Sequence, residues 1–443
     1  MEKNLNRGHP LGATASRPIP AYFFPLLGPD DACDAQDAER FASLLNRPAR
    51  PRRTLVYVHV PFCHSHCSFC SFYRRTVGND DPMLATYVDR VLDELSRWID
   101  AGTLSCTRIE AVYVGGGTPS VLPPAHARRL VSGLRRALPL PADTEISFEG
   151  EARTLSNPVL VAALREAGVT RLSFGVQSFD REVRRASGIR ASLDDVRACI
   201  ETLRRFDYPV CMDLMYGLPG QTLSVFAQDL VQAVEREAAV LIDLYGAILY
   251  PTAPLMQSDQ RAERQRLPHG AAAKAMYEQA LEYLATRGYR QITFEDFCQP
   301  AGEYRMKDLT YGGEDGEAQT LALGSCAVGY LAGHSYRNQV LESYLAGATN
   351  ILPLDRLRQA SSEERRRRAL FFYPRRLMLD LGALEGPVAP RDRAALDAHV
   401  ADGFATRTGD RYVLTRKGRT HADDLVRTFL RPEEHRKLFR LVQ

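Results

Sequence analysis

The sequence predicts an α/β protein whose core is a partial barrel of six β/α units, with an N-terminal extension and a C-terminal helical domain. Short β-rich runs alternate with amphipathic stretches from residue 55 to about residue 250. The runs are apolar on both faces, as in a parallel sheet covered by helices. Right-handed crossovers curl such a sheet into a full or partial barrel, and its chemistry lies at the carboxyl ends of the strands.

The first 54 residues form an extension that we expect to pack on the core. They are rich in Pro, Gly, Ala and Asp and show little periodicity, apart from the apolar stretch RPIPAYFFPLLGP. Such a stretch is expected to dock on the core or over a site, because it is too short to bury itself.

Residues 55–300 hold the barrel core. The predicted strands are LVYVHV, IEAVYVG, EISFEG, RLSFGVQ, PVCMDLMYG and LIDLYGAILY, and the helices between them include MLATYVDRVLDELSRWI, AHARRLVSGLRRAL, PVLVAALREAG and SVFAQDLVQAVEREA. Three clustered cysteines follow the first strand, GGGTP follows the second, and Glu149 closes the third. Since parallel strands end at one edge of a sheet, we expect these residues to meet in one site.

Two further sections complete the chain. Residues 301–360 are predicted to be a Gly-rich connecting section. Residues 361–443 read as a helix, a β-hairpin that turns at Gly409–Asp410 and a further helix, which is similar to a winged-helix module. Winged helices can bind DNA, but without a strong basic excess here we favour a packing role.

Composition narrows the class of partner. The chain of 443 residues has 57 Lys and Arg against 54 Asp and Glu, a formal net charge of +3. This balance argues against nucleic acid or an anionic membrane as the main partner. No segment approaches the roughly 20 apolar residues that span a bilayer, and the N-terminus lacks the apolar region of a signal peptide. Six of the nine cysteines stand singly among apolar neighbours, so we expect a cytoplasmic, reducing location.

The other three cysteines, Cys63, Cys67 and Cys70, fall within eight positions. A structural zinc site normally has four ligands, often as two separated pairs, and His64 and His66 could complete such a site here. Thiolates at this density on one short loop favour an iron–sulfur cluster instead. Three cysteines on a cluster of four irons leave one iron open to bind another molecule, which would explain why no fourth cysteine stands beside them.

The pattern C-x-x-x-C-x-x-C after a first strand, with Phe69 just before the last cysteine, resembles the radical S-adenosylmethionine (SAM) superfamily. The segment YVHVPFC resembles the corresponding segment in the branch that contains oxygen-independent coproporphyrinogen III oxidase. The resemblance continues through VYVGGGTPSVL, EISFEGEARTL, GVTRLSFGVQSFDREV, DLMYGLPGQT and LTRKGRTHADDLVRTFL, and it covers roughly residues 50 to 430.

The resemblance implies the site residues. The three cysteines would hold a 4Fe-4S cluster whose open iron chelates SAM, and reductive cleavage of SAM would give the 5′-deoxyadenosyl radical. The glycine run lets the backbone approach the methionine end of SAM, which side chains would block. A polar residue at the end of a strand could instead cap the next helix. For Gln177 and Asp213 this alternative to SAM binding stays open. The SAM contacts implied by the resemblance are Tyr57, Gly115, Gly116, Gly117, Thr118, Glu149, Gln177, Arg190 and Asp213.

Departures from coproporphyrinogen oxidases shape the functional prediction. Phe72 occupies the place of an additional cysteine in those enzymes, and YGGEDGEAQ replaces a later Gln-containing loop. We therefore predict a relative of the class C radical SAM methyltransferases and cyclopropane-forming enzymes, which bind two SAM molecules. In that mechanism the radical takes a hydrogen from the methyl group of the second SAM, and the methylene radical adds to an sp2 carbon of an unsaturated substrate. Its predicted catalytic residues are Glu149, Tyr57 and Glu295, with Asp296, Glu151 and Tyr250 as further candidates for acid–base work.

Two alternatives stay open. One is an oxygen-independent coproporphyrinogen III oxidase, and the other is a haem chaperone of the same family. The chaperones usually begin almost at the first strand, whereas this chain has about 55 residues ahead of it. The resemblance also implies an electron donor such as flavodoxin or ferredoxin, and we expect a monomer.

Overall fold

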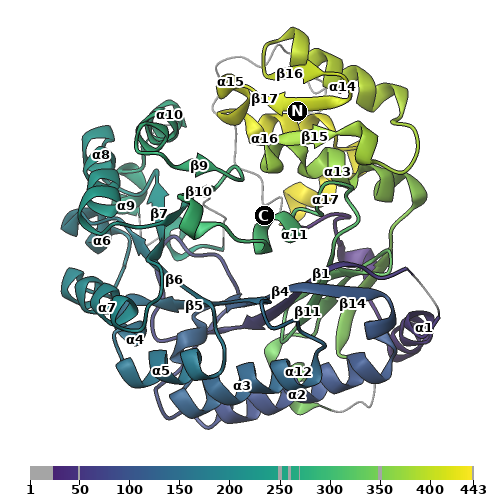
Figure 1. Cartoon of the computed structure of the whole chain (residues 1–443), viewed down its shortest axis with the longest axis horizontal. Coiled ribbons are helices and arrows are strands. Elements are labelled where there is room, and N and C mark those ends of the chain that lie inside the picture. The colour runs from purple at the N-terminus through teal and green to yellow at the C-terminus, as the bar shows by residue number, and fades with distance from the viewer. Residues whose placement is uncertain are drawn as a thin grey trace.

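The computed structural model describes residues 23–47, 50–247, 252–257, 261–268, 270–347 and 352–441, with side chains described as far as residue 437. Six parallel strands lie side by side in the order in which they occur in the chain (Figure 1). They are β1 (Arg52–Val60), β4 (Thr107–Gly116), β5 (Glu145–Glu151), β6 (Arg171–Gln177), β7 (Cys211–Tyr216) and β8 (Leu241–Gly246). All six predicted strands are therefore present, and the prediction of a partial β/α barrel is confirmed.

The sheet continues beyond both edges of this parallel unit. Next to β1, β11 adds one more parallel strand, and β12, β13 and β14 follow it in antiparallel pairing. Next to β8, β10 and β9 pair antiparallel. Residues 301–360, predicted as a connecting section, thus contribute four strands to the same sheet. The added strands are β9 (Arg290–Gln291), β10 (Asp296–Cys298), β11 (Gln319–Leu323), β12 (Val328–Leu331), β13 (His334–Asn338) and β14 (Leu354–Gln359).

Helices cover the outer face of the curved sheet (Figure 1). Alternation along β7 shows the two faces: Met212 and Leu214 join the main core, whereas Cys211 packs in a separate cluster with Leu241 and Cys298. These helices are α2 (Met83–Asp100), α3 (Pro124–Ala137), α4 (Ala152–Leu155), α5 (Pro158–Glu166), α6 (Arg181–Ala186), α7 (Leu193–Arg205), α8 (Leu223–Val231), α9 (Arg261–Gln265), α10 (Gly270–Thr286) and α12 (Leu341–Ala346). Among the residues that the structure describes, none of the helices has the length and hydropathy needed to cross a membrane.

The C-terminal region has the predicted helix–hairpin–helix order. Strands β15 (Met378–Asp380), β17 (Arg411–Leu414) and β16 (Ala405–Thr408) form a small sheet, and Thr408 pairs with Arg411 across the turn at Gly409–Asp410. The winged-helix-like arrangement is thus confirmed. Its helices are α13 (Ser362–Arg376), α14 (Pro390–Ala401), α15 (Arg416–Arg419), α16 (Ala422–Thr428) and α17 (Pro432–Leu441).

The described part of the N-terminal extension packs against this C-terminal region. Phe24 and Leu26 are buried in one cluster with Tyr311, Phe371 and other apolar residues, and the rings of Phe24 and Phe371 stack with centroids 4.5 Å apart. Farther along, α1 (Ala35–Leu45) buries Phe41 and Leu45 in the main core. In the part of the chain that is described, the extension therefore docks on the core, as the apolar stretch predicts.

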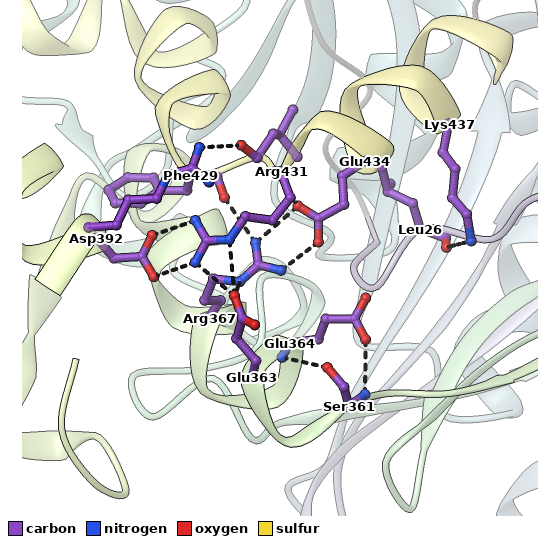
Figure 2. Close-up of polar contacts among 12 residues, drawn as sticks. Leu26, Ser361, Glu363, Glu364, Arg367, Asp392, Phe429, Arg431, Glu434 and Lys437 are labelled. Atoms are coloured by element: carbon purple, nitrogen blue, oxygen red, sulfur yellow. Dashed lines mark hydrogen bonds and ion pairs between the residues drawn. The ribbon is translucent and has the colours of Figure 1, made fainter. Parts of the chain in front are cut away.

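Buried ion pairs hold the last helix, and the residue before it, to α13 and α14 (Figure 2). The Arg367 guanidinium donates to both carboxylate oxygens of Glu434, at 3.0 and 2.6 Å, and Arg431 donates in the same way to Asp392 at 2.8 and 2.9 Å. On α17, Lys437 lies 3.0 Å from the carboxylate of Asp31 and so ties the N-terminal extension to the same helix.

Replacing Arg367 by Met should destabilise the chain, because Glu434 would remain buried without its cation. We expect the free energy of unfolding, measured by urea denaturation, to fall by about 3 kcal/mol or more. The matched control is Arg366→Met, one residue earlier on α13 and exposed, which should change it by less than about 0.5 kcal/mol. Equal losses in the two variants would show that the ion pair is not the cause.

Candidate active site at the mouth of the barrel

Polar side chains on the inner face of adjacent strands gather in one region inside the barrel, which is here called the chamber. Register places Asp213 of β7 beside Gly175 of β6 and beside Asp243 of β8, which lies opposite Asp296 of β10. On the other side of the chamber, the rings of Tyr57 (β1) and Tyr113 (β4) stack with centroids 5.9 Å apart. The small cluster of Leu55, Ala111, Met306, Leu309 and Ala318 fills the end of the barrel nearer the strand N-termini. The polar residues therefore lie nearer the carboxyl ends of the strands, where the cysteine loop follows β1.

Backbone contacts hold the cysteine loop in place. After β1 the chain forms β2 (Phe62–Cys63), which pairs with β3 (Arg75–Thr76), so the loop between them closes on itself. Within it, the N–H of Cys70 donates to the carbonyl of Cys67 at 3.2 Å, and the N–H of Val77 donates to the carbonyl of Cys63 at 3.1 Å. From a neighbouring loop, the carbonyl of Ser187 accepts from Ser68 N–H at 3.0 Å.

The three thiols fit a metal cluster. Burial, followed by the neighbouring Cys70 and Cys63, raises the pKa of Cys67 to about 12. Burial also raises the pKa of Cys63. The hydrogen bond that Thr118 Oγ1 donates to its sulfur at 3.3 Å acts in the opposite direction and lowers this pKa. Thiolates are the form that binds metal, so ionising them here needs a strong positive group, which an iron–sulfur cluster supplies.

The two histidines of the loop are engaged elsewhere, which counts against a zinc site. Nδ1 of His64 hydrogen-bonds the carbonyl of Val77 at 3.0 Å, and Nε2 of His66 hydrogen-bonds the Thr76 hydroxyl at 2.7 Å. Across the described ranges, no three His, Cys, Asp or Glu side chains are gathered for a single metal ion. A cluster of four irons places its thiolates farther apart than a single zinc ion does.

The glycine run after β4 packs directly on the cysteine loop. The N–H groups of Gly117 and Thr118 donate to the carbonyls of Val60 and Phe62 at 2.8 and 2.7 Å. A Cβ at Gly117 would lie 2.6 Å from the Phe62 carbonyl oxygen and 3.1 Å from the Cys63 sulfur. Glycine is therefore required at this position for the two loops to approach.

Glu149 lies at the centre of the predicted SAM contacts. Its carboxylate accepts hydrogen bonds from Gly116 N–H at 3.1 Å and from the Tyr113 hydroxyl. Burial, followed by the charge of Asp213, raises the pKa of Glu149 to about 8. On the same side of the chamber, the Tyr57 hydroxyl lies 2.7 Å from Nδ1 of His59, an imidazole whose pKa burial lowers to about 4. Tyr57, the glycines and Glu149 are thus brought together.

Of the remaining predicted SAM contacts, Gln177 and Asp213 are partly buried, whereas Arg190 is exposed. Gln177 has a left-handed backbone (φ 67°), and its buried Oε1 has no hydrogen-bond partner among the described residues. This orphaned acceptor fits the ribose hydroxyl that the resemblance implies. Burial raises the pKa of Asp213 to about 6. Arg190, in contrast, is exposed on the loop whose Ser187 contacts the cysteine loop, so its role stays a prediction.

The predicted acid–base residues are engaged in other contacts. Glu295 accepts from the Tyr311 hydroxyl at 2.6 Å and lies 3.5 Å from both Lys307 and Arg375, which is a residue of α13. Such contacts are those of an ion-pair network between the barrel and the C-terminal region, and the catalytic role of Glu295 stays a prediction. Likewise, Asp296 accepts from Tyr304 at 2.9 Å, and Glu151 lies 3.0 Å from Arg153. Tyr250 lies outside the described residues.

Sequence reasoning missed several residues of the chamber. Lys307, from α11 (Met306–Thr310), is buried 3.4 Å from Asp296 and donates to the Tyr245 hydroxyl at 3.0 Å. Arg171 lies 3.8 Å from Asp243 and 3.5 Å from the centre of the Tyr304 ring. Residues two positions apart on a strand face the same side of the sheet. The predicted contacts Tyr57 and Gly115 could therefore have indicated His59 and Tyr113. No sequence signal pointed to Lys307, because it comes from a short helix after the barrel.

The fold and the site define a barrel enzyme with a cysteine loop for an iron–sulfur cluster and a glycine-lined cradle for a small cofactor. The model of the radical SAM superfamily matches residues 57–231. The chain is 32% identical to anaerobilin synthase of Escherichia coli O157:H7, over 71% of this chain and 69% of that protein. It is also 32% identical to heme chaperone HemW of Mycobacterium tuberculosis, over 85% of this chain and 94% of that protein.

The chain therefore belongs to the radical SAM superfamily, as its cysteine motif predicts. Within it, the resemblance to the coproporphyrinogen III oxidase branch is also confirmed, since the chain is 30% identical to an oxygen-independent coproporphyrinogen III oxidase of Bradyrhizobium diazoefficiens over 73% of this chain and 71% of that protein. The solved structure of coproporphyrinogen III oxidase (HemN) from Escherichia coli superposes with a TM-score of 0.76 at 23% identity, covering 94% of this chain and 96% of that one. Membership implies a 4Fe-4S cluster and SAM as cofactors, which the thiols and the cradle fit.

Placing a methyl group at Gly117 should weaken cluster binding, because its neighbours are a fixed carbonyl and a cysteine sulfur. We expect Gly117→Ala to retain less than about half of the wild-type iron and sulfide after anaerobic reconstitution. Gly78→Ala is the control, since a Cβ there meets nothing within 4 Å. Wild-type iron content in both variants would contradict the account of this contact.

The raised pKa of Glu149 predicts a pH dependence of stability in the cluster-free chain. A carboxyl whose folded pKa is raised from 4.5 to about 8 stabilises the fold at low pH, and this contribution is lost as the pH rises through 8. The unfolding free energy should therefore fall between about pH 5 and pH 8, and Glu149→Gln should reduce that fall by roughly 3 to 4 kcal/mol. Parallel pH profiles of the two chains would contradict the prediction.

Proposed function

We propose that this chain is a radical SAM enzyme that acts on a tetrapyrrole. The observation that carries the proposal is the combination of a complete cysteine loop and SAM cradle with relatives named for haem and for a bilin. Each of those relatives is matched over more than two thirds of its own length. Phe72, in the place of an additional cysteine of coproporphyrinogen oxidases, favours haem over coproporphyrinogen as the substrate.

The cofactors would supply the 5′-deoxyadenosyl radical, and the chain would bind and orient them. Cys63, Cys67 and Cys70 would hold the cluster. The backbone of the glycine run would face the methionine end of SAM, and Gln177 would accept from its ribose. The stacked rings of Tyr57 and Tyr113 would wall the chamber and exclude water. Glu149, protonated below about pH 8, could hold a proton beside the reacting groups.

A more specific hypothesis is that the enzyme transfers a SAM-derived carbon to its substrate. The sequence predicts methylation or cyclopropanation with a second SAM molecule, whereas the relatives described above carry haem, bilin and coproporphyrinogen in their names. Those names favour the alternatives that the sequence left open, a tetrapyrrole oxidase or a haem chaperone. A second SAM therefore stays a prediction, and the tetrapyrrole substrate does not depend on it.

Anaerobic incubation tests the substrate class. The cluster-loaded, reduced chain receives methyl-deuterated SAM with haem, with coproporphyrinogen III or with neither, and 5′-deoxyadenosine is measured by mass spectrometry. Haem should raise 5′-deoxyadenosine formation by about tenfold over SAM alone and should itself be consumed. Deuterium in the 5′-deoxyadenosine would support a second SAM as the hydrogen source.

The blank is the triple variant Cys63→Ala, Cys67→Ala, Cys70→Ala, which should form no 5′-deoxyadenosine. A chain that cleaves SAM at the same rate with or without either tetrapyrrole would contradict the proposal. The second candidate, a haem chaperone, is favoured by the match over 94% of HemW. Tight haem binding with neither haem consumption nor faster SAM cleavage would support it.

A further inference from the structure

Gln177 lies at a strained turn that ends β6. Its φ is 67°, and the N–H of Ser178 donates to the carbonyl of Val176 at 2.9 Å across it. This is a γ-turn of the left-handed kind, which is rare and strained for any residue other than glycine. The pairing of β6 with β7 shifts register at the same point, between Gly175 and Gln177. Strained backbone of this kind persists only where neighbouring groups hold it, and it is frequent at binding sites.

The turn directs the Gln177 side chain into the chamber. Its Nε2 lies over Gly175, where a Cβ would clash with it, and Gly175 pairs with Asp213 on β7. Its buried Oε1 has no hydrogen-bond partner among the described residues. The next helix, α6, is capped by Asp180, whose carboxylate accepts from Val183 N–H at 2.9 Å, so Gln177 is not its cap. The strained turn therefore presents this acceptor beside Asp213, where the ribose of SAM is expected.

One buried arginine holds the carbonyls on both sides of Gln177. Arg184, on α6, is 4% exposed, and its Nη1 donates to the carbonyls of Val176 at 2.6 Å and Ser178 at 2.9 Å. Its Nη2 donates to the carbonyl of Ala191. Because the guanidinium is a planar, rigid fork, these contacts fix the backbone before and after Gln177 relative to the helix.

A buried carboxylate holds the segment that follows the turn. Asp229, on α8, is 1% exposed and accepts from the Ser178 hydroxyl at 2.8 Å and from Phe179 N–H at 2.6 Å. The Gln221 amide donates to the same carboxylate at 3.3 Å and to the carbonyl of Met215, on β7, at 2.9 Å. The turn is therefore held by side chains from two helices, neither of which is among the predicted SAM contacts.

We propose that Arg184 and Asp229 are positioning residues of the SAM site, which hold Gln177 in its left-handed turn so that its amide oxygen accepts from the ribose. The proposal rests on the SAM site of the proposed function, but not on the tetrapyrrole substrate. Without these contacts the backbone of Gln177 would relax out of the strained turn, and its amide would no longer be held over Gly175. SAM would then meet a side chain that must first be ordered, which costs affinity.

A double-mutant cycle on the cluster-loaded chain tests this coupling. SAM affinity is measured by anaerobic equilibrium dialysis with the cluster left oxidised, so that no SAM is cleaved and no turnover is involved. Gln177→Ala and Arg184→Met should each weaken SAM binding about tenfold, the effect of one hydrogen bond. The double variant should bind no more weakly than the weaker single variant, because Arg184 acts through Gln177. Arg185→Met is the matched control on α6, with a side chain 63% exposed, and should bind as the wild type does.

Asp229→Asn is a second and milder variant, since it keeps the shape of the side chain and one oxygen to accept from Phe179 N–H. We expect roughly threefold weaker SAM binding, which the Gln177→Ala background should again abolish. The iron content of each variant after reconstitution shows whether its cluster is loaded.

The strain at Gln177 has a readout that needs no SAM. Gln177→Gly should unfold at a higher urea concentration than Gln177→Ala, because glycine adopts a positive φ freely. Equal unfolding midpoints would contradict the strain on which the proposal depends.

Losses of SAM affinity that add in the double variants would overturn the proposal, because Arg184 and Asp229 would then act on the fold and not through Gln177. Unchanged affinity in both Arg184→Met and Asp229→Asn, or an equal loss in Arg185→Met, would overturn it too, as would failure of both positioning variants to hold the cluster. A wild-type chain that loads its cluster but binds no SAM would contradict the proposed function as well. No tetrapyrrole is present in these measurements, so they remain informative if that substrate proves wrong.

Discussion

The close approach of the glycine run to the cysteine loop is the constraint on which the site depends. Thr118 donates to the Cys63 sulfur, while Gly117 lies where any Cβ would meet the Phe62 carbonyl. The two segments follow neighbouring parallel strands, β1 and β4, whose register is continuous from the pair Leu55 and Ala111 to their ends at Val60 and Gly116. The sheet therefore sets the distance between the cluster ligands and the SAM cradle.

Charged groups of both signs lie together inside the barrel. Glu149, Asp213, Asp243 and Asp296 share a chamber with Lys307, together with Arg171. Burial and neighbouring carboxylates raise the pKa of Asp243 as well as that of Glu149, so protons are held beside the place where SAM is expected. An enzyme that generates radicals must keep water away from the reacting groups to prevent side reactions.

The features that could be predicted are those whose residues lie close together in the sequence. Cys63, Cys67 and Cys70 lie in one eight-residue segment, and the strand alternation is local as well, so the cluster loop and the six parallel strands were predictable. The strands within residues 301–360 were missed because they are only four to six residues long and do not alternate clearly between apolar and polar residues. Glu295 shows the limit for site residues. Its position in the stretch ITFEDF, taken as a strand end, suggested catalysis, but Arg375, 80 positions later in the numbering, lies 3.5 Å away. Long-range pairs of this kind leave no mark in one sequence.

The central claim is that three cysteines hold a cluster of four irons with one iron open for SAM. Mössbauer spectroscopy of the chain reconstituted with 57Fe tests it most directly, with and without SAM. The account predicts that about one quarter of the iron signal, one iron of four, changes its isomer shift when SAM is added. A four-iron spectrum that SAM leaves unchanged would contradict an open iron, and with it the assignment of the chamber to SAM.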